Sequence, residues 1–269
     1  MSYVCFKLNS KIGTVMQSNK LTNILSYNIH NSSLDVIVDQ IIRSMKIASK
    51  PQWLACLNPH SYVVACDDKG FSAALHDADW LIPDGVGIVL ASRVSGGNIE
   101  RRVAGFDIFY GLQSALTKNG SARVFFLGST THTLEVIAEK MSLDFPNLKV
   151  AGTYSPPFKD AYSDSEIDEM VNCINRSNSD VLWVGLTAPK QEKWIFQNKQ
   201  RLNVKFIGAI GAVFDFYSGN VKRSSPLFRQ LGLEWLPRLL QQPHRLWRRV
   251  FISGAIFITH LIKDYFGRR

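Results

Sequence analysis

Hydrophobic residues fall along the chain in two alternating patterns, which predict strands and helices in turn. Short continuous apolar runs, typical of buried strands, occupy residues 53–57, 80–82, 122–127, 148–154, 180–184 and 205–210. Helical periodicity covers residues 34–46, 60–65, 71–78, 86–94, 133–142, 164–175 and 189–198. Apolar strands that alternate with amphipathic helices predict an α/β fold with a parallel sheet.

The pattern changes after Gly219. From there the chain is typical of helices rich in Leu, Trp and Arg, and it contains no strand-like run. We therefore expect an α/β core at residues 1–220 and a C-terminal helical appendage at residues 221–269. Residues 1–20 show no clear pattern.

Positive charge is concentrated in the appendage. The formal net charge is +9, and residues 222–269 carry +8 of it, with ten Lys or Arg and two acids. Their longest uncharged apolar run, residues 250–262, has 13 residues, too few to span a bilayer. Basic residues interleaved with Leu and Trp indicate a helix on an anionic membrane surface. Because the N-terminus lacks a signal-peptide pattern, we expect a cytoplasmic protein, peripheral on the inner face of the membrane.

Two other function classes fit parts of this composition. A basic nucleic-acid-binding α/β protein is the non-enzymatic alternative. It would spread cations and exposed aromatics over a whole face, so we expect no nucleic-acid partner. A nucleotide-dependent oxidoreductase needs a glycine-rich fingerprint followed by an acid, which the chain lacks. The four cysteines have neither metal-ligand spacing nor paired histidines.

Polar and glycine-containing motifs follow most of the predicted strands. They are Asn58-Pro59, Pro83-Asp84-Gly85, Gly128-Ser129, residues 185–191 and residues 208–215. In an open parallel sheet, ligands bind at the edge where the strands end. The convergence of these motifs predicts an active site at that edge.

Each motif also has a purely structural interpretation. Asp84 at a strand exit can act as a general base, or it can belong to an ordinary Pro-Asp-Gly turn. Gly128-Ser129 can present backbone amides to a phosphate, or it can make a tight turn before a capped helix. Gln191 and its neighbour Lys190 can reach a diphosphate or a sugar, or they can form a solvated helix start.

Three further features concern metals, nucleophiles and cations. Asp77-Ala78-Asp79 matches the DxD pattern of metal-dependent sugar transferases, but side chains two apart on a helix do not share a face, so we expect no metal there. Cys56 has no evident His partner and is better explained as a small buried residue at a strand end. Arg238, Arg245 and Arg248 are spaced by seven and three. On a continuous helix they would share one face, turned towards a diphosphate, a membrane or solvent.

The ordered set of motifs resembles the WecG/TagA/CpsF family of bacterial glycosyltransferases. The resembling segments run from about residue 24 to residue 265, and the most specific are Pro189-Lys190-Gln191-Glu192 and residues 231–236, Leu-Gly-Leu-Glu-Trp-Leu. The others are Leu57-Asn58-Pro59, residues 78–79 and 83–87, Arg102 with Gly105-Phe106-Asp107, and residues 126–129, 208–216 and 219–223.

This resemblance implies a Rossmann-like core and an inverting transfer of a hexose-type sugar in cell-surface polysaccharide biosynthesis. The donor would be a UDP-sugar and the acceptor a polyprenyl-diphosphate-linked sugar, with no cofactor and no required metal. The resemblance points to Asp84 as the base. It places Asn58, Arg102 and Gln191 in the pocket, and the three arginines Arg238, Arg245 and Arg248 on an appendage that completes the site at the membrane.

Without a metal, the leaving diphosphate needs other positive partners. We expect them to be backbone amides near Gly128 and Ser129 and cations from the appendage. Cys56 and Gly185, at the ends of two predicted strands, complete the expected substrate-binding set.

Two departures from the family pattern bear on the donor sugar. The position of Cys56 is often Thr in the family, so a hydroxyl contact with the donor is altered here. Residues 154–158, Tyr-Ser-Pro-Pro-Phe, differ from the pattern of members that use N-acetylmannosamine-type donors and are closer to the exopolysaccharide branch. The expected donor is UDP-glucose; the alternative is an N-acetylmannosaminyl- or N-acetylmannosaminuronyl-type transferase. A homo-oligomer is left open.

Overall fold

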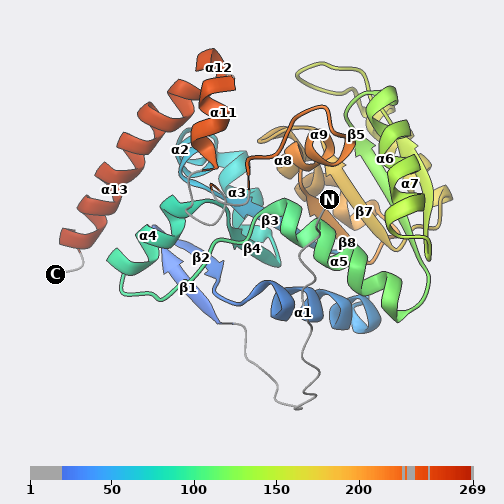
Figure 1. The fold of residues 1–269 in the computed structure, drawn as a ribbon, viewed down its shortest axis with the longest axis horizontal. Coiled ribbons are helices and arrows are strands. Elements are labelled where there is room, and N and C mark those ends of the chain that lie inside the picture. The colour runs from blue at the N-terminus through green and yellow to red at the C-terminus, as the bar shows by residue number, and fades with distance from the viewer. Residues whose placement is uncertain (1–19, 226–227, 229–233, 242, 268–269) are drawn as a thin grey trace.

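The core of the molecule is a parallel sheet of six strands in the order β4-β3-β8-β7-β5-β6 (Figure 1). The computed structural model describes residues 20–225, 228, 234–241 and 243–267. The strands are β3 (Gln52–Leu57), β4 (Trp80–Pro83), β5 (Ala122–Gly128), β6 (Leu148–Tyr154), β7 (Val181–Gly185) and β8 (Phe206–Ala209). Each coincides with a predicted apolar run, so the Rossmann-like α/β class is confirmed.

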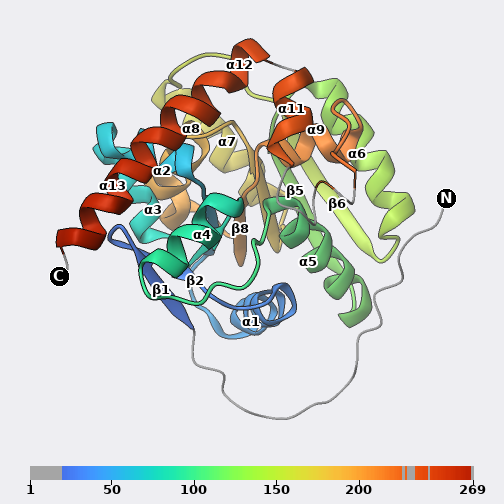
Figure 2. The same cartoon turned by 60° about the vertical axis from the view of Figure 1, so that its left-hand side comes forward.

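Helices cover both faces of this sheet (Figures 1 and 2). Successive strand residues point to opposite faces, so Trp53 and Leu54 of β3 enter two different apolar clusters. The Trp53 cluster includes α2 (Pro59–Asp67), α3 (Lys69–Asp77), α4 (Val86–Val94), α7 (Asp164–Arg176) and α8 (Lys190–Asn198). The Leu54 cluster includes α1 (Leu34–Ile47), α5 (Gly105–Asn119), α6 (Thr131–Asp144) and α9 (Ala212–Ser218). Two buried faces explain why the central strands β7 and β8 are apolar throughout.

Two strands and two helices of the structure were not predicted from the hydrophobic pattern. They are the antiparallel hairpin of β1 (Leu21–Ile24) and β2 (Tyr27–His30), and the helices α5 and α9. The hairpin adds Ile24 and Ile29 to the Trp53 cluster. Helix α5 buries Ile108 and Leu112 completely, so it is a central part of the core.

After residue 219 the described residues form helices and no strand. These are α11 (Trp235–Gln241), α12 (Pro243–Trp247), the π-helical turn η2 (Arg248–Ile252) and α13 (Ser253–Gly267). Helix α13 lies beside α2 (Figures 1 and 2). Phe257 and Leu261 of α13 are buried in the Trp53 cluster, and Tyr62 Oη lies 3.0 Å from His260 Nδ1. The C-terminal helix is therefore docked on the α/β core.

Residues 248–267 form one helix of 20 residues. By length and composition alone it could cross a bilayer, which the 13-residue apolar run seen in the sequence did not suggest. Its two sides differ, however. Ser253, Phe257 and Leu261 are buried against the domain, whereas the opposite stripe is exposed and consists of Phe251, Ile258, Ile262 and Phe266. One side of the helix therefore packs on the domain, and apolar side chains are exposed on the other.

The contact between β7 and β8 allows no side chain at position 208. A Cβ atom on Gly208 would lie 2.2 Å from Cζ3 of Trp183, which is fully buried between Phe109 and Phe206. Gly208→Ala should therefore lower the free energy of unfolding by about 1–3 kcal/mol or more, measured by urea unfolding. The matched control is Gly254→Ala, where nothing lies within 4 Å and which should be neutral or stabilising.

Candidate active site

A cavity of about 750 Å³ opens at the carboxyl edge of the sheet. Its walls include the ends of the six strands or the loops that follow them. Of the residues expected at a site, it is lined by Cys56, Asn58, Asp84, Arg102, Ser129, Gly185 and Gln191. Its volume is in the range of pockets that bind small molecules and cofactors, so a nucleotide-sugar fits by size.

Asp84 follows β4 directly and is held there by its backbone. Its N–H donates to the Leu57 carbonyl at 2.8 Å, which continues the pairing of β4 with β3. Desolvation raises the pKa of the Asp84 carboxyl, while Arg102, Arg249 and a hydrogen bond from Asn58 lower it and Glu234 raises it. A desolvated carboxylate at a cavity wall suits a general base better than a solvated turn residue does.

Asn58 connects this acid to helix α2. Its Oδ1 accepts from the Ser61 N–H at 3.0 Å, and its own N–H donates to Ser61 Oγ at 2.8 Å. This capping box fixes the side chain, so that the amide can hydrogen-bond to Asp84. The predicted end of β3 at Asn58-Pro59 is thus both a helix cap and part of the cavity wall.

The Gly128-Ser129 turn has a different role from the one expected. A Cβ atom on Gly128 would lie 2.4 Å from the Gly185 carbonyl oxygen, and the Ser129 N–H donates to that oxygen at 3.2 Å. The Ser129 amide is therefore used within the sheet edge, and Gly128 lies behind the cavity wall and not in it. Thr130 accepts from the Thr133 N–H and caps α6, whose first turn borders the cavity.

Gln191 and Glu192 form a buried polar pair at the start of α8. Gln191 Nε2 donates to Glu192 Oε1 at 2.8 Å, and Gln191 Oε1 accepts from the Gly211 N–H at 3.1 Å. Glu192 is only 2% exposed, and its Oε2 has no hydrogen-bond partner among the described residues. Desolvation raises the pKa of Glu192 to about 7. The sequence motif indicated Lys190 and Gln191 as the polar groups of this helix start, whereas the structure also buries Glu192 beside them.

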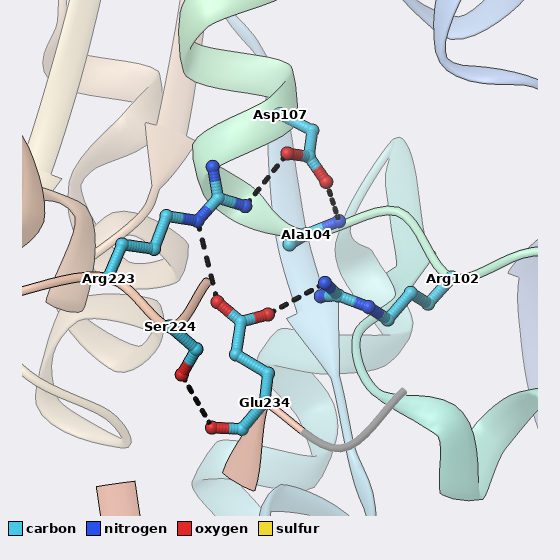
Figure 3. A network of polar contacts seen from close by, with 6 residues as sticks. All are labelled: Arg102, Ala104, Asp107, Arg223, Ser224 and Glu234. Atoms are coloured by element: carbon cyan, nitrogen blue, oxygen red, sulfur yellow. Dashed lines mark hydrogen bonds and ion pairs between the residues drawn. The ribbon is translucent and has the colours of Figure 1, made fainter. Parts of the chain in front are cut away.

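Arg102 enters the cavity wall through an ion-pair network (Figure 3). Its guanidinium lies 2.7 Å from Glu234, which lies 3.4 Å from Arg223, and Arg223 lies 2.9 Å from Asp107. Arg223 and Glu234 also line the cavity. Both were visible in the sequence only as part of the family motifs, because nothing in a lone Glu within a basic segment indicates that it faces the site.

Of the three arginines expected on one helix face, the structure describes the side chain of Arg248 only. Arg248 lies 5.7 Å from the Trp247 ring and does not line the cavity, whereas its neighbour Arg249 does. Arg249 lies on the π-helical turn at residues 248–252 and was not among the arginines expected at the site. The side chains of Arg238 and Arg245 lie outside the described residues.

Two features that resembled chemistry are structural. Asp77 accepts from the Trp53 indole Nε1 and Asp79 from the Trp53 N–H, both at 2.9 Å, so these carboxylates tie β3 to the residues before β4. In the parts of the chain that the structure describes, no group of three His, Cys, Asp or Glu could hold a metal. Desolvation, with the carboxylates of Asp84 and Glu192, raises the pKa of the Cys56 thiol well above its usual value, which disfavours a nucleophilic thiolate.

Glu192 should make stability depend on pH. Its pKa rises from 4.5 to about 7 on folding, so its contribution is present below pH 4.5 and lost as pH rises to about 7. Glu192→Gln should remove this dependence. Urea unfolding at several pH values should show the wild type losing about 3 kcal/mol relative to the variant over that range. His30 and His60 titrate in both proteins and cancel. Glu135→Gln, at an exposed position, should behave like the wild type.

Comparison with known proteins shows what this chain is similar to. The chain is 31% identical to a Bacillus spizizenii N-acetylglucosaminyldiphosphoundecaprenol N-acetyl-beta-D-mannosaminyltransferase over 87% of each chain. It is 30% identical to the Bacillus subtilis protein of the same name over 93% of each. A Staphylococcus aureus protein of that name is 24% identical over 90% of this chain and 92% of its own.

The sequence profile of the glycosyl transferase WecG/TagA/CpsF family matches residues 22–269, which include all the described strands and helices except Leu21, the first residue of β1. The match extends over the cavity, the ion-pair network and the C-terminal helices alike. With the two relatives at 30% identity or above, it shows that this chain belongs to the WecG/TagA/CpsF family of glycosyltransferases.

Proposed function

We propose that this protein transfers N-acetylmannosamine from UDP-N-acetylmannosamine to N-acetylglucosaminyl-diphosphoundecaprenol, with a β-linked product. The observation that carries the proposal is the desolvated Asp84 at the wall of a nucleotide-sized cavity. The sugar and the acceptor come from the relatives, whose names give an N-acetyl-β-D-mannosaminyl group and that lipid-linked acceptor. These relatives favour the N-acetylmannosaminyl alternative over the UDP-glucose donor that the sequence first suggested.

In this proposal the reaction is a direct displacement. Asp84 takes the proton from the acceptor hydroxyl as the hydroxyl oxygen attacks the anomeric carbon, and the bond from that carbon to the UDP diphosphate breaks. An α-linked UDP-sugar then gives a β-linked product, which is inversion. The first turn of α6 and the guanidinium of Arg249 border the same cavity and are suited to stabilise the negative charge of the leaving diphosphate.

In this proposal the C-terminal helix α13 binds the membrane surface. The exposed stripe of α13 and its preceding turn includes Phe251 at 58%, Ile258 at 56%, Ile262 at 50% and Phe266 at 68% exposure. A large apolar stripe beside a basic segment is suited to lie in the interface of an anionic membrane. We therefore place the enzyme on the inner face of the cytoplasmic membrane, where it meets the diphosphate head of its lipid-linked acceptor.

A donor screen tests the proposed function. Purified protein is given UDP-N-acetylmannosamine, UDP-glucose or UDP-N-acetylglucosamine with a lipid-diphosphate-linked N-acetylglucosamine acceptor, in buffer that contains EDTA. We expect product only with the first donor, with a β linkage by NMR and with undiminished rate in EDTA. Transfer of glucose alone would contradict the proposal and favour UDP-glucose as the donor. Full dependence of the rate on Mn²⁺ or Mg²⁺ would contradict the metal-free mechanism.

Asp84→Asn should lower the transfer rate by about 10²- to 10⁴-fold, the usual effect of losing a general base. UDP affinity, measured by calorimetry, should stay close to that of the wild type, because the change removes charge and not volume. The control is Asp168→Asn, since Asp168 is an exposed partner of Arg201 and does not line the cavity. A turnover within a few-fold of wild type for Asp84→Asn would remove this residue from the mechanism.

Replacing the exposed stripe should separate membrane binding from chemistry. Ile258→Ser, Ile262→Ser and Phe266→Ser together should weaken binding to anionic liposomes by about 100-fold or more, because each buried apolar side chain contributes on the order of 1–3 kcal/mol. Transfer to a soluble short-chain acceptor should survive. The matched control is Ile47→Ser with Leu143→Ser, two exposed apolar residues on α1 and α6. Unchanged liposome binding in the triple variant would refute the interfacial helix.

A further inference from the structure

Glu234 lies at the centre of the ion-pair network beside the cavity. Its Oε2 lies 2.7 Å from Arg102 and its Oε1 lies 3.4 Å from Arg223, so one carboxylate joins two guanidinium groups (Figure 3). The three side chains are 15–17% exposed. Their mutual interactions are therefore screened less by water and salt than those of a surface pair.

The position of Glu234 is fixed by further contacts. Ser224 Oγ donates to the Glu234 carbonyl at 3.1 Å. The Arg223 guanidinium lies 4.1 Å from the centre of the Phe106 ring and 2.9 Å from Asp107, both on the first turn of α5. The segment that precedes α11 is thereby attached to the core at the edge of the active-site cavity.

Charged groups from several elements face Asp84. Arg102 comes from the loop before α5, Arg249 from the π-helical turn, and Glu234 from the segment before α11. Asn58 contributes a hydrogen bond from the start of α2, and the carboxylate of Glu192 acts on the Cys56 thiol beside this site. After desolvation, the two arginines lower the pKa of Asp84 and Glu234 raises it.

The balance of these charges matters for a base. Two unopposed guanidinium groups would stabilise the Asp84 carboxylate and make it a weaker proton acceptor. With no cation nearby, desolvation would keep the carboxyl protonated and unable to accept a proton. Glu234 pairs with Arg102, one of the two arginines, and so gives Asp84 a proton affinity between these two limits.

We propose that Glu234 is a positioning residue of the transfer reaction: it holds Arg102 beside Asp84 and offsets part of the guanidinium charge, so that the docked C-terminal segment sets the strength of the catalytic base. This inference rests on the proposed function only for the identity of the reaction. It differs from a merely mechanical clamp, whose loss would change stability or docking and leave the titration of Asp84 unchanged.

The test follows the titration of Asp84 in the full-length protein. Carboxyl-¹³C-aspartate labelling and NMR give the titration, with the Asp84 resonance assigned by its absence in Asp84→Asn. Glu234→Gln should move the Asp84 titration, and the acidic limb of the kcat/KM profile, to lower pH. Arg102→Gln should move both to higher pH, and the double variant should fall between the two single variants.

Asp168→Asn changes the formal charge by the same amount as Glu234→Gln and serves as the control, with no shift expected. An unmoved titration, or a shift to higher pH, in Glu234→Gln would overturn the proposal. If Glu234→Gln does not fold, Glu234→Asp retracts the same charge and should shift the titration in the same direction by less. Because NMR needs no turnover, the inference can be tested even where the wild type transfers no N-acetylmannosamine, which would refute only the proposed function.

Discussion

Parallel strand pairing is the constraint on which the site depends. Because every strand of the sheet runs in the same direction, the ends of β4, β3, β8, β7 and β5 meet at one edge. That edge is where the apolar runs stop and the polar residues begin. The contact between Gly128 and Gly185 shows how close the strands come there, since a single Cβ atom on Gly128 would meet the backbone of the next strand. The backbone therefore determines where polar side chains can gather.

Acidic side chains at this desolvated edge are costly in their charged form, and cations from other parts of the molecule offset that cost. Asp84 and Glu192 both have raised pKa values because desolvation disfavours their charged forms. Cations reach the cavity from outside the sheet, through Arg102 in a loop and Arg249 in the C-terminal segment. The bulk charge of +8 in the tail is less informative than these contacts, because only individual guanidinium groups within a few ångströms act strongly on a carboxylate.

The sequence predicted the parts of the structure that are governed by local patterns. The six core strands are mostly apolar, and Asp84 and Asn58 were found because they directly follow two of them. Helix α5 was missed although Ile108 and Leu112 repeat at helical spacing, since glycines at its first and seventh positions weaken the helical pattern. Arg223 and Glu234 were missed as site residues because their partners Asp107 and Arg102 are distant in the chain. Glu192 was missed because the sequence does not show that its side chain is buried. Arg249 was not singled out from the sequence, because it is one of ten Lys or Arg residues in the tail and spacing alone does not say which of them reaches the cavity.

The C-terminal helix α13 has one side that packs on the core and one side that is apolar and exposed. The stripe of Ser253, Phe257 and Leu261 attaches α13 to α2, and the opposite stripe is apolar and exposed. The residues just before α13 include Arg249, which reaches the cavity, so docking of the helix and the electrostatics of the site are coupled through the same backbone. A helix that also engages lipid through its free stripe would bring the acceptor's diphosphate to the face where Asp84 is ready to accept a proton. Membrane engagement and base strength then depend on one packing interaction, between α13 and α2.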